Sequence, residues 1–246
     1  MSKILVKDLD GVRVISFNRP EKRNALDLDM YSQLTEYLMQ GESDNDIRAF
    51  LLTGEANCFT SGNDVADFLQ NSELGPNHPA VRFLYCLLEL KKPVVAAVSG
   101  SAVGIGTTLL LHCDLVYADN SAKFQLPFVN LALVPEAGAS ILLPELVGYQ
   151  KAAELLLLGE PFDAETALSF RLINALCPRD ALQQTALDKA RKLASQPPQA
   201  LQQTRQLMRP HKHRVQHQMH LELEAFGERL RSDEAKARFQ AFLTKA

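Results

Sequence analysis

One carboxylate and two glycine turns are the features of this sequence that could do chemistry. Glu136 follows a proline, and burial would raise its pKa from the ordinary value of about 4.3, which suits a group that accepts and returns a proton. Its apolar neighbours are Phe128, Leu131, Leu133 and Val134. The turns Gly62-Asn63 and Gly104-Ile105 are tight, and the second opens a helix, so backbone N–H groups can face a negative charge there. Together these features favour proton transfer beside a stabilised anion.

The glycine-rich segment 99–106 does not match a nucleotide site. It lacks the Gly-Lys-Ser/Thr of a phosphate-binding loop, and Gly104-Ile105-Gly106 lacks the third glycine of the dinucleotide motif. The sequence also has no Gly-x-Ser-x-Gly elbow and no His-Glu-x-x-His zinc helix. Because these motifs are missing, the sequence gives no support to nucleotide, serine-hydrolase or zinc-protease chemistry.

Four of the six histidines lie close together near the C-terminus. They are His211, His213, His217 and His220. On a helix the last three share one face, which would suit a metal. The rest of the segment is Lys, Arg and Gln, which is typical of a solvated or subunit-facing surface, so we expect no metal. A metal-responsive assembly is the alternative reading.

Composition and charge limit the class of protein. The 246 residues carry a net charge of −3, which does not favour a nucleic-acid partner. The four cysteines form no Cys-x-x-Cys pair, so reduced thiols are expected. The first residues lack an apolar signal region, the last three are not Ser-Lys-Leu, and no run of about 18 apolar residues occurs. We expect a cytoplasmic protein without a membrane span.

Strands and helices must position these groups. Apolar runs predict strands at 4–7, 12–18, 49–53, 93–98 and 115–118, the first two joined by an Asp10-Gly11 turn. Periodic segments predict a helix capped by Asp27, then helices at 80–90 and 107–112, and an almost wholly helical pattern after residue 145. The sequence predicts an α/β core over 1–194 and a helical region over 195–246.

Three segments, in order and in register, resemble the crotonase (enoyl-CoA hydratase/isomerase) superfamily. Residues 18–26 are similar to its Asn-Arg-Pro segment, and residues 58–65 to its Gly-x-Asp segment. Residues 92–106, with Cys113-Asp114-Leu115, are similar to its Lys-Pro strand and glycine turn. The resemblance implies a spiral core of ββα turns, a C-terminal region that forms homotrimers or dimers of trimers, and an acyl-CoA thioester as substrate, with no separate cofactor.

The resemblance also assigns roles to residues. The backbone N–H groups of Asn63 and Ile105 would hold the thioester oxygen as an enolate forms. The glycine more usual at the latter position is replaced by isoleucine, which requires a negative φ. Residues expected around coenzyme A are Arg23, Ala25, Leu26, Thr60, Ser61, Gly62, Asp64 and Gly104. Lys22 and Arg23 would meet its phosphates.

The carboxylates distinguish an isomerase from a hydratase. Hydratases of the family use two glutamates to hold water, and this chain has Thr108 and Phe128 at those positions. Residues 134–138 instead resemble the Ser-Pro-Glu-Gly segment of the peroxisomal-type Δ3,Δ2-enoyl-CoA isomerases, which makes Glu136 the expected base. One carboxylate can take a proton from C2 and return it at C4 without water. Ala137 and Ala139 depart from the glycine and the small polar residue usual in that branch.

Several alternatives remain open on the sequence alone. Another enolate reaction on the same scaffold, such as thioester hydrolysis or an atypical hydration, would need a nucleophile or a water beside Glu136. A non-catalytic module would bind acyl-CoA without turnover. The fold by itself does not choose among these reactions.

Overall fold

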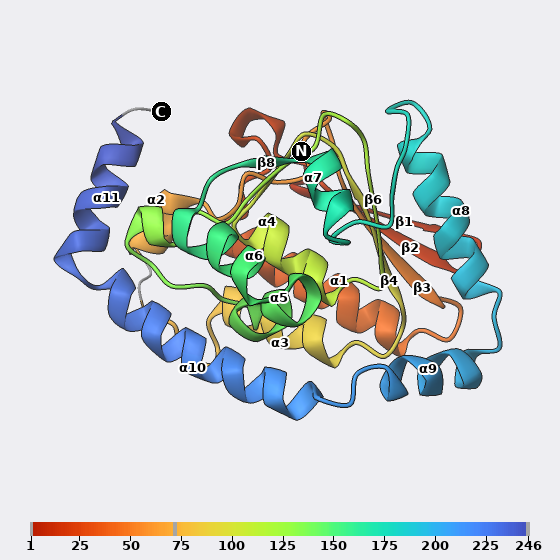
Figure 1. Cartoon of the computed structure of the whole chain (residues 1–246). Coiled ribbons are helices and arrows are strands. Elements are labelled where there is room, and N and C mark those ends of the chain that lie inside the picture. The colour runs from red at the N-terminus through yellow and green to blue at the C-terminus, as the bar shows by residue number, and fades with distance from the viewer. Residues whose placement is uncertain (1, 71–72, 245–246) are drawn as a thin grey trace.

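Helices surround two β-sheets in the computed structural model, which describes residues 2–70 and 73–244 (Figure 1). Within these residues, no helix combines the length and the apolar character that crossing a membrane would require. The combination of helices and two sheets confirms the predicted α/β class.

A hairpin of two strands opens the chain. Strands β1 (Ile4–Leu9) and β2 (Val12–Phe17) pair antiparallel across the turn between them. Asp10 and Gly11 take φ values of 51° and 80°, the left-handed conformation that a two-residue hairpin turn needs. The predicted hairpin is confirmed.

The hairpin extends into a sheet of six strands. The added strands are β3 (Ala49–Gly54), β4 (Val94–Val98), β6 (Leu115–Ala118) and β9 (Ala175–Leu176). They run parallel to β2, in the order β1-β2-β3-β4-β6-β9. Strands β3 and β4 are almost wholly buried because helices cover both faces of the sheet, which explains why their sequences are continuous apolar runs.

A smaller sheet contains the glycine-rich segment. Its strands are β5 (Ser101–Val103), β7 (Lys123–Gln125) and β8 (Phe162–Asp163). One prediction is incomplete here, because residues 99–106, predicted as a turn, contain strand β5, while the nearly all-helical pattern predicted after residue 145 holds apart from the two-residue strands β8 and β9. Strands of two or three residues are too short to show an alternating pattern in a sequence.

Alternate residues of the central strands enter two apolar clusters, one on each face of the main sheet. Along β3, Phe50 and Leu52 join the larger core, whereas Ala49 and Leu51 pack against helix α8 (Leu182–Ala194). The remaining helices are α1 (Leu28–Ser43), α2 (Val65–Gln70), α3 (Pro79–Glu89), α4 (Ile105–Thr108), α5 (Ala139–Val147), α6 (Tyr149–Ala153), α7 (Ala164–Ser169), α9 (Pro198–Leu207), α10 (Lys212–Leu230) and α11 (Asp233–Leu243). A 3₁₀ turn at Leu109–His112 continues α4.

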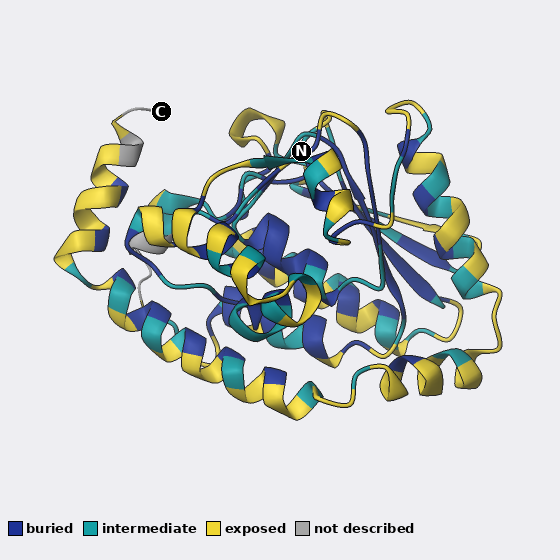
Figure 2. Ribbon diagram, viewed as in Figure 1, coloured by how far each residue is buried: buried dark blue, intermediate teal, exposed yellow. Residues whose placement is uncertain are grey.

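The last three helices wrap around the outside of the core (Figure 1). The boundary predicted near residue 194 falls between α8 and α9. Helix α10 turns one face inward and exposes the other (Figure 2). Its buried residues include Val215, Met219, Glu222, Phe226 and Leu230. Their spacing of three and four residues is that of a single helix face, and one member of that face is a glutamate.

Candidate active site

Glu136 lies in a pocket between the core and the C-terminal helices. The side chain is in the loop before α5 and the residue is only 5% exposed. The pocket is lined by Tyr31, Asn63, Leu74, Ala80, Val81, Leu84, Glu136, Leu223 and Phe226. Among these described residues Glu136 is the one carboxylate, and most of the others are apolar.

Burial raises the pKa of Glu136 to about 8. The hydroxyl of Thr108 acts in the opposite direction, since it donates a hydrogen bond of 2.5 Å to Oε1 of Glu136. The negative charge of Glu222 on α10 raises the pKa further. The carboxyl group is thus poised to exchange a proton near neutral pH.

The residue after the carboxylate has an unusual backbone conformation. Ala137 takes a φ of 61° and Gly138 a φ of 73°, both left-handed. Only glycine adopts this conformation readily, which explains why a glycine is usual at position 137 in the branch that the segment resembles. The buried ring of His112 offers Nε2 to the carbonyl oxygen of Ala137 at 2.7 Å. This hydrogen bond holds the strained turn in place.

The two glycine turns lie side by side. Thr60 bridges to Ala102 in a parallel arrangement, and the Val103 N–H donates to the Thr60 carbonyl at 3.1 Å. Further along, Gly62 lies against Val103, where a Cβ on the glycine would be 2.8 Å from the Val103 carbonyl oxygen, so Asn63 and Ile105 follow on two adjacent turns. Within the described part of the chain, neither of these two N–H groups has a hydrogen-bond acceptor. Two free donors on neighbouring turns suit a developing oxyanion.

Glycine is required at both turns for different reasons. Gly62 has a φ of 96°, and a Cβ there would lie 2.8 Å from the Val103 carbonyl oxygen. Gly104 combines a φ of 56° with a ψ of −117°, a region that only glycine enters easily. Ile105 begins α4 and is not among the residues with positive φ, as its side chain requires.

The residues expected around coenzyme A converge on one pair of loops. Hydrogen bonds run from Ser61 N–H to the Arg23 carbonyl at 3.0 Å and from Leu26 N–H to the Gly62 carbonyl at 2.8 Å. Ala25 lies within the same loop. The Arg23 guanidinium is exposed and donates at 2.5 Å to the hydroxyl of Ser101, the first residue of β5. The structure therefore brings these residues together beside Gly104.

Three of the expected coenzyme A residues have structural tasks of their own. The Thr60 side chain is fully buried and donates to the Asn24 carbonyl at 2.7 Å. Leu26 is also fully buried. Asp64 accepts a hydrogen bond from Arg19 at 2.7 Å. Their side chains shape the loops, so that only backbone groups or remaining lone pairs could meet a ligand.

Several residues of the site had no supporting role assigned from the sequence, where Thr108 entered only as the replacement for a hydratase glutamate. The Tyr31 hydroxyl donates to Oδ1 of Asn63, and Thr108, His112 and Glu222 support the Glu136 loop. Thr108 and His112 could have been found because they lie three and seven residues after Ile105, on one face of a helix. Glu222 gave no such signal, because its contacts lie more than 80 positions earlier in the chain.

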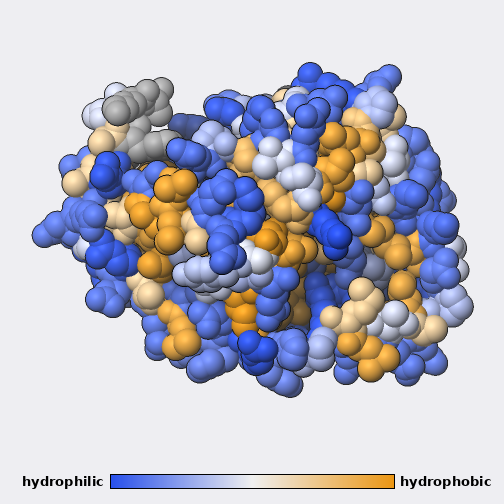
Figure 3. Space-filling view, in the orientation of Figure 1, coloured by the Kyte–Doolittle hydropathy of each residue, from blue (hydrophilic) through white to orange (hydrophobic). Residues whose placement is uncertain are grey.

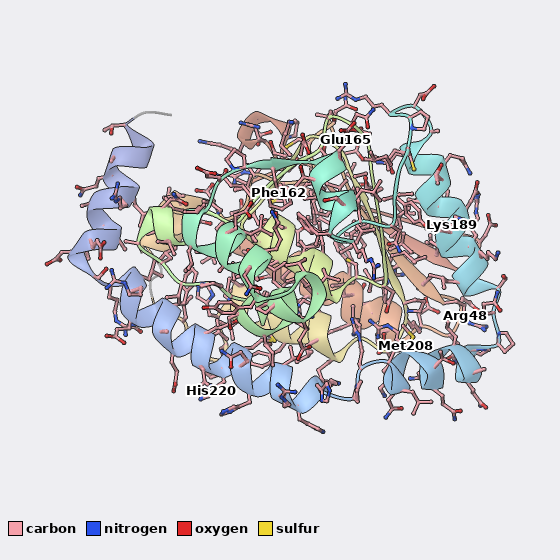
Figure 4. The ribbon with its side chains drawn as sticks, viewed as in Figure 1. Arg48, Phe162, Glu165, Lys189, Met208 and His220 are labelled. Atoms are coloured by element: carbon pink, nitrogen blue, oxygen red, sulfur yellow. The ribbon has the colours of Figure 1, made fainter. Side chains whose placement is uncertain are left out.

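The cluster of four histidines at positions 211–220 lies apart from this pocket. His213, His217 and His220 are on the exposed face of α10, and Figure 4 shows the His220 side chain directed away from the core. His220 lies 3.4 Å from Glu224 one turn later. In residues 2–70 and 73–244, no group of three or more His, Cys, Asp and Glu side chains is arranged to hold a metal ion.

Comparisons with known proteins agree with this arrangement. The family described as Enoyl-CoA hydratase/isomerase matches residues 8–246. The chain is 39% identical over 198 residues to the 1,2-epoxyphenylacetyl-CoA isomerase of Escherichia coli (strain K12), covering 76% of this chain and 74% of that protein. It is 31% identical over 214 residues to the peroxisomal Enoyl-CoA delta isomerase 3 of Mus musculus, covering 85% and 67%. Other relatives are named as hydratases or dehalogenases.

A solved structure supports the same assignment over almost the full chain. OdaA of Pseudomonas aeruginosa is 42% identical, and its structure superposes with a TM-score of 0.96 over 99% of both chains. With this similarity in sequence and fold, the chain belongs to the enoyl-CoA hydratase/isomerase family of the crotonase superfamily, whose members act on acyl-CoA thioesters.

Proposed function

We propose that this protein is an isomerase that moves the double bond of a 3-enoyl-CoA thioester to position 2. Glu136 removes a proton from C2 and returns it at C4. The dienolate oxygen accepts hydrogen bonds from the backbone N–H groups of Asn63 and Ile105. The observation that carries the proposal is a single buried carboxyl group, with a pKa of about 8, in an otherwise largely apolar pocket.

The pKa of Glu136 suits both halves of this reaction. A base with a pKa near the working pH takes up a proton and gives it back with similar ease. Burial in the pocket is the main cause of the raised pKa, so the same apolar wall that would receive the acyl chain also prepares the base. The relative named Enoyl-CoA delta isomerase 3 supports this choice of reaction.

The residues present at the two glutamate positions of hydratases argue against ordinary hydration. Thr108 is fully buried and its hydroxyl is engaged with Glu136. Phe128 is 4% exposed and belongs to the main apolar core. Neither side chain can activate a water as a carboxylate would.

Coenzyme A would lie across the paired loops near Gly104 and Ser61. Lys22 and Arg23 would supply positive charge to its phosphates, and the backbone of Ala25 and Leu26 would meet the adenine. The open position of Arg23 supports this placement, whereas the buried side chains of Thr60 and Leu26 would act only through the shape of the loops.

The direct test is the conversion of a trans-3-enoyl-CoA by the wild type and by Glu136→Gln. We expect turnover by the wild type and a loss of about 10²-fold or more in the variant. Glu160→Gln, which changes an exposed glutamate, is the matched control. A wild type that binds acyl-CoA without converting it would contradict the proposal, and equal rates in Glu136→Gln would place the base elsewhere.

A second candidate substrate follows from the relative with 39% identity. That protein is named as an isomerase of 1,2-epoxyphenylacetyl-CoA, which is also a coenzyme A thioester. The pocket of this chain holds polar groups from Tyr31 and Asn63 in addition to Glu136, and these could meet an oxygen on the acyl group. Assaying both thioesters side by side would show which one is the better substrate, as a ratio of kcat/KM values.

A homotrimer, or a dimer of trimers, is part of the same proposal. Figure 3 shows orange apolar patches on the face to which α5 and α6 contribute. Exposed apolar residues of these elements and of the following turn are Leu146, Tyr149, Leu157 and Leu158. Assembly would cover surface of this kind. Light scattering coupled to gel filtration would give the number of chains, and a monomer would contradict the expectation.

A further inference from the structure

A glutamate of the C-terminal region reaches the loop that carries Glu136. Glu222 lies in the middle of α10 and is 5% exposed. Its carboxylate accepts three hydrogen bonds at the start of α5, from Gly138 N–H at 2.6 Å, from Ser140 N–H at 2.8 Å and from the Ser140 hydroxyl at 2.5 Å. Gly138 has no side chain with which to cap α5, so Glu222 supplies the missing acceptor from a distant helix.

This contact is close to the candidate base along the chain. Gly138 is two residues after Glu136, and the Ala139 N–H donates to the Glu136 carbonyl at 3.1 Å. His112 holds the same turn through the Ala137 carbonyl. The segment 136–140 is thus clamped between the 3₁₀ turn that follows α4 and helix α10.

The same helix also forms a wall of the pocket. Leu223 and Phe226, one and four residues after Glu222, line the space in front of Glu136. A displacement of α10 would therefore open the pocket and remove the acceptor from the Glu136 loop together. The pocket wall and the support of the base are carried by one rigid element.

From this geometry we propose that Glu222 is a positioning residue: its three hydrogen bonds fix the loop that carries Glu136, and they place a second carboxylate against Gly138, two residues from that base. The proposal rests on the proposed function of Glu136 as the base. It adds a task for the C-terminal region, because docking of α10 becomes a condition for a working site.

Glu222 carries the charge that acts on Glu136, because the other groups described near that carboxylate are neutral. Thr108 of α4 donates a hydrogen bond and carries no charge. Burial raises the pKa of Tyr31 in α1 well above its ordinary value of 10.0, which keeps the phenol neutral. Burial lowers the pKa of His112 to about 4, so the imidazole is neutral at pH 7. Arg205 and Arg209 act on His112 rather than on Glu136.

The test removes the charge with little change in the size of the side chain. In Glu222→Gln the remaining oxygen can still accept from Ser140, whereas the oxygen that accepts from the Gly138 N–H is replaced by an amide NH₂, and the negative charge is lost. The positive end of the α5 dipole is then no longer compensated, which also favours an ionised Glu136. Glu228→Gln is the matched control, because Glu228 is an exposed residue of the same helix and the change in net charge is the same.

The readout is the titration of the Glu136 carboxyl carbon by NMR, in protein labelled with ¹³C at glutamate Cδ. Glu136→Gln identifies the signal by its loss. We expect the midpoint to move to lower pH by about half a unit or more in Glu222→Gln, and to stay in place in Glu228→Gln. The pH profile of kcat/KM for 3-enoyl-CoA isomerisation moves in the same direction.

An unmoved midpoint in Glu222→Gln overturns the proposal, even if the rate falls, because a merely structural role would lower the rate without shifting the titration. If Glu222→Gln does not fold, Ser140→Ala is the second variant. It removes the hydroxyl that stabilises the Glu222 charge, and we expect a smaller shift in the same direction. A wild type that fails to isomerise while the midpoint shifts as expected would reject the proposed function and leave the coupling of the two glutamates intact.

Discussion

The hydroxyl of Thr108 donates a hydrogen bond of 2.5 Å to Oε1 of Glu136. It joins the helix that begins with Ile105, whose N–H has no acceptor among the described residues, to the loop that carries the buried carboxylate. One short helical segment therefore positions a candidate oxyanion donor, the side chain of the candidate base and, through His112, the backbone of the next residue.

Thr108→Val should leave less of Glu136 in its ionised, proton-accepting form at neutral pH. The isosteric change removes a hydrogen bond that favours the ionised carboxylate, so the pKa of Glu136 should rise above its value of about 8. The rising limb of the plot of kcat/KM against pH should move to higher pH, and the rate at pH 7 should fall several-fold. Thr204→Val changes an exposed threonine of α9 and serves as the control. A limb that stays in place would mean that the hydroxyl does not tune the base.

Glu136→Gln should stabilise the protein in alkaline solution. The pKa of Glu136 is about 8 in the folded protein because of burial, against an ordinary value of about 4.3. Between these pH values the folded state binds more protons than the unfolded state, so stability falls as pH rises. The variant lacks this loss. Urea unfolding should show it to be more stable than the wild type at pH 8 by an amount on the order of a few kcal/mol, with the gain shrinking towards pH 4.

A gain of the same size at pH 4 and pH 8 would contradict this reasoning, because it would not come from the proton. Glu160→Gln, at an exposed site, should show no such dependence.

Tyr31→Phe should slow the reaction more than it weakens binding. The variant loses the hydroxyl that donates to Oδ1 of Asn63, whose backbone N–H is one of the two proposed oxyanion donors. We expect kcat to fall roughly 10-fold with KM little changed, since a direct donor would cost about 10² to 10³. Tyr37→Phe, at a half-buried tyrosine of the same helix that does not line the pocket, is the comparison. A change confined to KM would argue that Tyr31 only shapes the pocket.

His112→Phe should lower stability at neutral pH and change its dependence on acid. The carbonyl of Ala137 loses its donor, which should cost about 1–3 kcal/mol. Burial lowers the pKa of His112 to about 4 from 6.5, so the wild type loses stability as pH falls from 6.5 to 4. The variant has no such loss, and the gap between the two proteins should narrow in acid. Unfolding curves at pH 7 and pH 4.5 measure both effects, and a constant gap would refute the second.

The sequence was a good guide to the strands and helices with a regular pattern. The hairpin, the apolar strands β3 and β4 and the helix capped by Asp27 follow from local signals, and the Asp27 side chain indeed accepts from the Met30 N–H at 2.9 Å. Strand β5 was missed, although its pairing with Thr60 is what aligns the two glycine turns. Three residues carry too little pattern to be recognised without their partner strand.

Residue types by themselves determined the chemistry that this protein could support. A lone carboxylate among apolar neighbours, two glycine turns and the absence of the hydratase glutamates are all visible in the printed chain. These features are local, because they depend on side-chain chemistry and on the backbone freedom of glycine.

Only the tertiary structure decided which distant groups act on that carboxylate. The partners in the Glu136 loop lie 28 positions from Thr108 and 25 positions from His112. They lie 84 and 82 positions from Glu222. Burial, which sets the pKa of Glu136, is likewise a property of the packed core and of helix α10 that closes over it. Contacts of this range arise when the chain folds back on itself, and no periodic pattern in the sequence records them.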